Sequence, residues 1–258
     1  MMPRQRTEAA RELSQNLQQR LPVTSWRTRF APAPTGFLHL GHVVNAIHVW
    51  GIARAFGGKV VLRIEDHDRQ RCHREFEAAL LDDLDWLGFV PDFGATSEFR
   101  SGAHSLRQSD NANRYESALQ TLARKKLLYP CACSRRDIEA VALRSTSDEL
   151  RYPGICEQLS IGESTTAARR LRIDAATYEF NDLRLGEQRQ TPAQQCGDFL
   201  VRDRLGQYTY QFSVAVDDTE QNIDVIIRGE DLLQSTGRQL QLSRALDRKH
   251  APRFLHHA

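Results

Sequence analysis

The chain has 258 residues, of which 40% are hydrophobic and 26% are charged, and its net charge is +2. This length allows a substantial core in one or two domains, and the composition is that of an ordinary globular protein. No apolar run approaches the ~18 residues that a membrane-spanning helix needs. The N-terminus also lacks the apolar core of a signal peptide. We therefore expect a cytoplasmic protein that does not bind membranes. Separately, we expect it to be a monomer.

Helix and strand patterns alternate along the first half of the chain. Residues 1–25 are predicted to form a polar N-terminal extension in which Leu13, Leu17 and Leu21 share one helical stripe. A solvated or disordered arm is the alternative. Apolar periodicity then predicts strands at 27–31 and 59–64, and helices at 43–56, 74–87 and 111–127. This alternation favours an α/β fold, with a parallel sheet covered by helices.

The pattern changes after residue 130, where close cysteines and a polar helix predict an insertion. Further strands are predicted at 169–174, 198–202, 208–216 and 223–228, and a leucine-bearing helix follows them. The expected organisation has three parts after the extension: the first half of the main domain at 26–130, the insertion at 131–196 and the second half at 197–258.

An unusual segment, RFAPAPTG at 29–36, follows the first strand. Its prolines hold the backbone extended, and Gly36 allows a turn. His39 and His42 then bracket Gly41 in front of a helix. Backbone donors at a helix N-terminus suit a polyphosphate, and paired imidazoles can stabilise charge developing at phosphorus. Taken alone, a proline-rich loop followed by two unrelated surface histidines explains the pattern as well.

The second strand pattern ends in charged residues, Arg63, Glu65 and Asp66. A carboxylate just beyond a neighbouring strand suits a cationic group on a second substrate. Together with the histidine segment, it indicates a site that joins a nucleotide to a small amine-bearing molecule. The alternative for Glu65 is an ion pair with Arg63 or Arg69.

These motifs resemble those of the class I aminoacyl-tRNA synthetases of the glutamyl type. HLGH matches the first signature of the class, and RFAPAPTG and LRIEDHDRQR match motifs of the glutamyl family. QSDNANRYESAL and VDDTEQNIDVIIRGEDLLQSTGRQLQL fit the same pattern. The resemblance covers about residues 26–256. It implies a Rossmann-like α/β catalytic domain that uses ATP with Mg²⁺, L-glutamate and a tRNA.

The resemblance also assigns residue roles. The glutamate pocket would be formed by Arg29, Ala31, Ala33, Glu65, Tyr210 and Arg228. The ATP site would include Pro32, Gly36, His39, Gly41 and His42. Glu65 would bind the substrate ammonium, the arginines suit carboxylates because of their bidentate donor fork, and the two histidines would be catalytic. For Arg228 the alternative is a strand-end salt bridge with Glu230 or Asp231. Ala33 replaces a small hydroxyl residue common in the family.

Cys131 and Cys133 are followed about twenty residues later by Tyr152 and Cys156. Two close thiolates and a second ligand pair form a plausible tetrahedral zinc arrangement, and reduced, metal-free cysteines are the alternative. A truncated branch of the family, the glutamyl-Q tRNA(Asp) synthetases, carries Cys-x-Cys and Tyr-x-x-x-Cys as zinc ligands. The resemblance therefore implies a structural Zn²⁺ bound by these four residues.

From its length, we expect the chain to lack the helical domain with which full glutamyl-tRNA synthetases read the anticodon. This matches the truncated branch, a group of ligases that transfer glutamate to the queuosine base at the first anticodon position of tRNA(Asp). The alternatives are a synthetase fragment that charges the tRNA 3′ end, and a non-catalytic module that binds glutamate or RNA. The sequence contains no Lys-x-Ser-Lys loop, the second class signature. We therefore expect weak adenylate formation by the chain as it stands.

Overall fold

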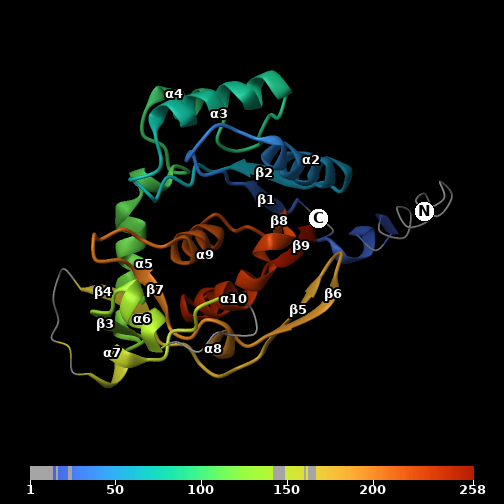
Figure 1. The fold of residues 1–258 in the computed structure, drawn as a ribbon. Coiled ribbons are helices and arrows are strands. Elements are labelled where there is room, and N and C mark those ends of the chain that lie inside the picture. The colour runs from blue at the N-terminus through green and yellow to red at the C-terminus, as the bar shows by residue number, and fades with distance from the viewer. Residues whose placement is uncertain (1–13, 16, 23–24, 142–148, 160, 162–166) are drawn as a thin grey trace.

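The computed structural model describes residues 14–15, 17–22, 25–141, 149–159, 161 and 167–258. Figure 1 shows a central layer of parallel strands with helices packed around it, and a small antiparallel sheet at the lower left. Leu13 lies outside the described residues. Leu17 and Leu21, each 4% exposed, pack into the main core beside Trp26. This part of the N-terminal extension is therefore held by apolar contacts.

Four parallel strands form the centre of the molecule: β1 (Arg27–Phe30), β2 (Lys59–Leu62), β8 (Val225–Gly229) and β9 (Arg253–His257). β1 lies beside β8, because the Asp224 N–H donates to the Arg27 carbonyl at 2.9 Å and Arg29 Nη1 donates to the Ile227 carbonyl at 3.2 Å. The residue numbers of the partners rise together along both strands, so the two strands run in the same direction. The carboxyl ends of all four strands therefore meet at one edge, and the predicted parallel sheet is confirmed.

A hairpin extends this sheet on the far side of β9. It consists of β5 (Tyr178–Asp182) and β6 (Gly186–Gln190), and β5 joins β9 in parallel at the Asp182–Phe254 pair. The strand order is β6-β5-β9-β8. The sequence did not predict this hairpin, which lies within the expected insertion. Its pairing with β9 is set by contacts far along the chain, and no local pattern reports such contacts.

Helices cover the parallel strands: α2 (Leu40–Ala55), α3 (Arg74–Leu87), α4 (Thr96–Ser101), α5 (Ala112–Arg124), α9 (Tyr210–Glu220) and α10 (Thr236–Ala245), with short 3₁₀ turns η1 (Gln108–Asp110) and η2 (Glu230–Ser235). α3 buries Leu80, Leu81 and Leu84 on one stripe and ends at Gly88, whose φ of 75° favours glycine. α2 begins three residues before its predicted start. None of the described helices is both long and apolar enough to cross a membrane.

The prediction of a strand at 208–216 is wrong, because α9 occupies most of that segment. Every residue from Phe212 to Asp218 is buried. A helix that is buried on all sides shows no polar face, so its 3.6-residue period is invisible in the sequence. Its aromatic and β-branched residues also favour a strand.

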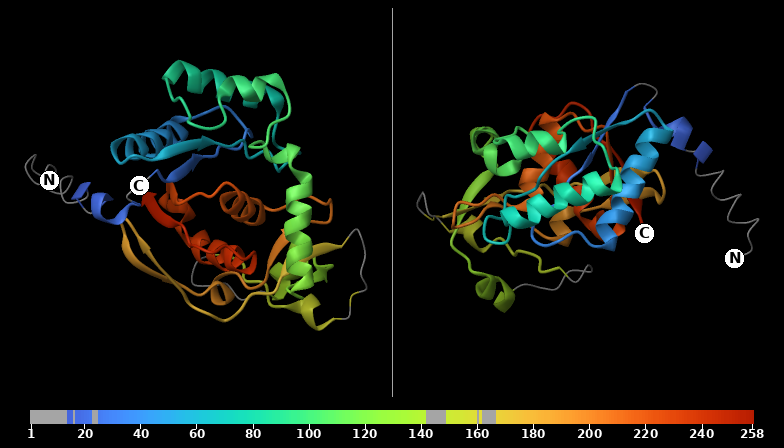
Figure 2. Two further views of the ribbon diagram at one scale, coloured as in Figure 1. Left: turned by 180° about the vertical axis from the view of Figure 1, so that it is seen from behind. Right: turned by 90° about the horizontal axis from the view of Figure 1, so that it is seen from above.

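The small antiparallel sheet has the order β3-β4-β7, with β3 (Leu128–Cys131), β4 (Ala168–Leu171) and β7 (Phe199–Arg202). Three short helices accompany it: α6 (Arg135–Val141), α7 (Ile155–Gln158) and α8 (Pro192–Gln195). Figure 2 shows α5 running from the parallel layer to this sheet. β3 and β7 lie at the two expected boundaries of the insertion, and both pair with β4. The boundaries themselves stay predictions.

Candidate functional site

The carboxyl ends of the parallel strands bring four of the predicted pocket residues together. Arg29 lies on β1, Glu65 follows β2, Arg228 lies on β8 and Tyr210 is the first residue of α9. Burial raises the pKa of the Tyr210 phenol, the charge of Glu65 raises it further, and the charges of Arg228 and Arg29 oppose these effects. The neutral phenol therefore lies within electrostatic reach of all three charged groups.

Arg29 and Arg63 share one buried carboxylate, Asp218. Arg29 Nε lies 3.4 Å from Asp218 Oδ1, and Arg63 Nη1 donates to the same oxygen at 2.8 Å. Burial alone would raise the pKa of Asp218, but the two guanidinium charges outweigh burial and lower it. Arg63 also donates to Gln221. This network joins the ends of β1 and β2 to α9.

Glu65 is 4% exposed, and its Oε1 accepts hydrogen bonds from Arg63 Nε at 3.1 Å and Nη2 at 2.7 Å. The alternative interpretation, an ion pair with Arg63, therefore describes one oxygen of this carboxylate correctly. Among the described residues, no hydrogen bond is made to Oε2. Arg63 thus orients the carboxylate and leaves one oxygen available for a cation.

Arg228 is a buried cation whose hydrogen-bond partners are neutral side chains. Its side chain is buried, and it donates from Nη1 to Gln239 Oε1 at 2.7 Å and from Nη2 to Thr236 Oγ1 at 2.8 Å. No described carboxylate lies within 4.0 Å of its guanidinium, so the alternative pairing with Glu230 or Asp231 is wrong. Burial lowers the pKa of Arg228 to about 10, although Tyr210 partly compensates. A buried cation without an anion is a strong binding site for a substrate carboxylate.

The third donor of Arg228, Nε, bonds to His256 Nε2 at 2.9 Å. The other ring nitrogen of His256, Nδ1, lies 2.7 Å from Asp182 Oδ2, and both of these side chains are fully buried. Neither residue was predicted from the sequence to belong to the site. Two adjacent histidines at the end of an apolar segment were the available signal, but the strand β9 that carries them was not predicted.

The loop between β1 and α2 carries the remaining predicted pocket residues. Pro32 is buried, whereas Ala31, Ala33 and Gly36 are partly exposed. The Pro32 carbonyl accepts a hydrogen bond from the Glu65 N–H at 3.0 Å. This bond fixes the loop against the end of β2.

His39 is the N-cap residue of α2, and its Nδ1 accepts from the Gly41 N–H at 3.1 Å. His42 Nδ1 accepts from the His39 N–H at 3.2 Å. Since both Nδ1 atoms accept, the neutral rings carry their protons on Nε2, where each can donate to an anion. A side chain at position 41 would lie 3.0 Å from the His39 ring. Burial and the neighbouring His39 lower the pKa of His42.

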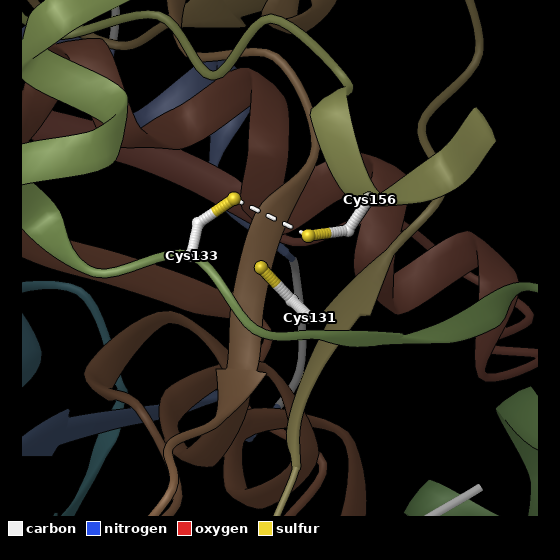
Figure 3. Close-up of side chains that lie close together, drawn as sticks. All are labelled: Cys131, Cys133 and Cys156. Carbon is white, nitrogen blue, oxygen red and sulfur yellow. Dashed lines mark hydrogen bonds between the residues drawn. The ribbon is translucent and has the colours of Figure 1, made fainter. Parts of the chain in front are cut away.

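Three cysteine side chains gather beside the antiparallel sheet, and Figure 3 shows their sulfur atoms pointing toward one another. The Sγ atoms of Cys131, Cys133 and Cys156 all lie within 4.8 Å of each other. The Sγ atoms of Cys133 and Cys156 are 3.2 Å apart. The hydroxyl oxygen of Tyr152 lies 3.7 Å from the Sγ atoms of both Cys131 and Cys133. Tetrahedral Zn²⁺ with bonds of about 2.3 Å places its sulfur ligands about 3.8 Å apart. The cluster is consistent with a zinc site.

The surroundings of Cys131 and Cys156 favour the thiolate form. Arg170 donates from Nε to Cys131 Sγ at 3.2 Å, and its guanidinium lies 3.6 Å from the centre of the Tyr152 ring. Burial alone would raise the pKa of Cys156, but hydrogen bonds from Tyr152 and the Ala132 amide lower it to about 7. Burial raises the pKa of Cys133 to about 11, and it also raises the pKa of the Tyr152 phenol. Metal ligands must be deprotonated, so a cation would have to displace the protons of these two groups.

Comparison with known proteins establishes the family. The sequence model described as tRNA synthetases class I (E and Q), catalytic domain, matches residues 25–258. The chain belongs to this class I synthetase family. A glutamyl-Q tRNA(Asp) synthetase of Pseudomonas fluorescens is 40% identical over 233 residues, which cover 90% of this chain and 72% of that protein. A glutamate–tRNA ligase 2 of Syntrophus aciditrophicus is 38% identical over 244 residues, which cover 91% of this chain and 49% of that protein.

The solved structure of a glutamate-tRNA synthetase from Elizabethkingia anophelis superimposes with a TM-score of 0.75 at 26% identity, covering 90% of this chain and 50% of that protein. The Rossmann-like class I fold expected from the resemblance is thereby confirmed. The chain spans about half the length of this ligase and of this synthetase.

Proposed function

We propose that this class I family member activates L-glutamate with ATP and transfers it to the queuosine base of tRNA(Asp). The observation that carries the proposal is the buried guanidinium of Arg228, which has no described carboxylate partner. Arg29 supplies a second cation, and Glu65 offers one carboxylate oxygen toward the same region. A molecule with two carboxylates and one ammonium requires this set of charges. The name of the Pseudomonas fluorescens relative supports the choice of acceptor.

In the proposed first step, an oxygen of the glutamate α-carboxylate attacks the α-phosphorus of ATP. The bond to the bridging oxygen breaks, and pyrophosphate leaves. His39 and His42 would donate from Nε2 to the phosphoryl oxygens as charge develops there. Pro32, Gly36 and Gly41 would let the nucleotide approach the backbone, and the Mg²⁺ that would accompany ATP stays a prediction.

In the second step, a hydroxyl group of the queuosine cyclopentene ring attacks the activated carbonyl. An ester forms, AMP leaves and the hydroxyl proton is released. No covalent enzyme intermediate is needed, so the pocket contributes mainly by orienting the two substrates and by its charges. Ala31 and Ala33 would line the space for the glutamate side chain, and Tyr210 would contact it from α9.

We also propose that Cys131, Cys133 and Cys156 hold Zn²⁺ with Tyr152 as the fourth ligand. The 3.7 Å spacing of the tyrosine hydroxyl from two of the sulfur atoms supports this ligand set. The metal would have no open position for a substrate, so its role would be to hold α7 against β3. A cytoplasmic location and a monomeric state also stay predictions.

The acceptor is tested with tRNA(Asp) that lacks its 3′-terminal adenosine, prepared with and without queuosine. Labelled glutamate is expected to transfer only to the queuosine-containing form, because the proposed acceptor hydroxyl is on that base. Transfer that requires the terminal adenosine would instead identify 3′-end charging. Absence of transfer to every tRNA, with glutamate binding intact by calorimetry, would support the non-catalytic module.

A basic cavity supports an RNA partner. It has a volume of about 930 Å³, lies at the other end of β9 from Arg228, and is lined in part by Arg244, Arg248, Lys249 and Arg253. None of these four side chains has a described carboxylate within 4.0 Å. Cations without acidic partners around one cavity suit the phosphates of a nucleic acid.

Neutralising two of these cations, with Arg244→Gln and Lys249→Gln, is expected to weaken tRNA binding. The slope of log affinity against log salt should fall by about 1.5, because each lost phosphate contact contributes roughly 0.7–0.9. The control pair is Arg54→Gln and Arg100→Gln, since both residues already pair with carboxylates. An equal slope change in the two double variants, measured by salt-dependent filter binding, would reject the cavity as an RNA contact.

A further inference from the structure

We propose that His256 and Asp182 are positioning residues that orient Arg228 for a substrate carboxylate. This inference rests on the proposed function, in which Arg228 binds glutamate. It assigns the orientation of the binding group to a buried chain of hydrogen bonds that runs from β5 through β9 to β8.

The proton positions along this chain follow from Arg228. A guanidinium Nε–H can only donate, so His256 Nε2 must accept with its lone pair. The ring proton is then on Nδ1, where it donates to Asp182 Oδ2 at 2.7 Å. Protonation of Nε2 would set two N–H groups against each other across 2.9 Å. The geometry therefore requires a neutral imidazole with one defined tautomer.

Asp182 is itself held rigidly, since its Oδ1 accepts from the N–H groups of Arg184 at 2.9 Å and Leu185 at 2.8 Å. Its Oδ2 accepts from the His256 backbone N–H at 3.1 Å as well as from the ring. Burial lowers the pKa of His256, and the charge of Arg228 adds to this effect despite the opposing bond to Asp182. Asp182 is thus ionised and accepts from the neutral ring of His256.

The strands place the three side chains in one row. Arg228 and His256 are direct partners in the parallel pairing of β8 with β9. Arg228 has five N–H groups, and the bonds to His256, Gln239 and Thr236 use one on each nitrogen. One N–H therefore remains on each of Nη1 and Nη2, for Tyr210 and a substrate carboxylate. His256 fixes the third nitrogen, so rotation of the fork away from the pocket would break that bond.

Two substitutions at His256 distinguish its role in orienting Arg228 from a contribution to the stability of the fold. In His256→Gln the amide oxygen can replace Nε2 as the acceptor for Arg228, whereas in His256→Asn the shorter amide reaches only toward Asp182. We expect the asparagine variant to bind L-glutamate about 10- to 100-fold more weakly by calorimetry, the range for a lost hydrogen bond to a charged group. The glutamine variant should lose less than about fivefold, and ATP affinity should be unchanged in both.

The melting temperature of each variant is compared with that of Tyr129→Phe, which removes a partly buried hydrogen bond from β3 to Asp198. A glutamate affinity that is equal in the two His256 variants would overturn the proposal. If neither variant folds, the ¹⁵N chemical shifts of the His256 ring in the unaltered protein give the protonation state of Nε2. An unprotonated Nε2 supports the proposal, and a protonated Nε2 overturns it. Unchanged glutamate binding by Arg228→Gln would instead reject the proposed function itself.

Discussion

Arg228→Gln is expected to weaken L-glutamate binding by roughly 30- to 4,000-fold, since losing one partner of a buried charge pair costs about 2–5 kcal/mol. ATP binding should be spared, because the histidines that would contact ATP lie at the start of α2, whereas Arg228 lies on β8. Isothermal calorimetry with each ligand measures both effects.

The same substitution should leave the melting temperature unchanged or higher. Burial lowers the pKa of Arg228 to about 10, below its usual value, so the ligand-free fold disfavours this charge. The matched control is Arg63→Gln, whose guanidinium is also fully buried but is bonded to Glu65 and Asp218. It should destabilise the protein by about 3–5 kcal/mol, because it leaves buried carboxylates without their cation. A small effect of Arg228→Gln on glutamate binding would remove Arg228 from the pocket.

Cys133→Ser is expected to reduce bound zinc from one equivalent to a small fraction and to lower the melting temperature markedly. Three thiolates, of which Cys133 is one, would provide most of the metal affinity, and the metal would join β3 to α7. Metal content is measured by atomic absorption after dialysis. Cys72→Ser serves as the control, because Cys72 lies outside the cluster and contacts the Glu65 carbonyl.

Tyr152→Phe tests the fourth ligand separately. It keeps the ring beneath Arg170 and all three thiolates, so we expect the protein to fold and to bind zinc more weakly. An unchanged zinc affinity in this variant would show that another group completes the coordination. Glutamate affinity should change little in either variant, since neither residue contacts the pocket side chains.

The sequence alone predicted the elements that local patterns define. The strands at β1 and β2, the helices α2, α3 and α5, and the His39–His42 segment all follow from apolar periodicity and from Gly and Pro placement over a few residues. The cysteine cluster was also visible, because its ligand types and spacings lie within one short stretch. The pocket residues came from the resemblance of whole motifs to a known family.

Only the tertiary structure decided how the charges of the pocket are paired. Arg63 meets Asp218 across 155 residues, and Asp182 meets His256 across 74. Such pairs depend on which strands become neighbours, and the parallel pairing of β9 with β5 and β8 has no local signature. α9 was mistaken for a strand for a related reason, since burial on every side removes the polar face that reveals a helix. Local chemistry thus identified the groups, and long-range packing determined that Arg228 remains without a described anion.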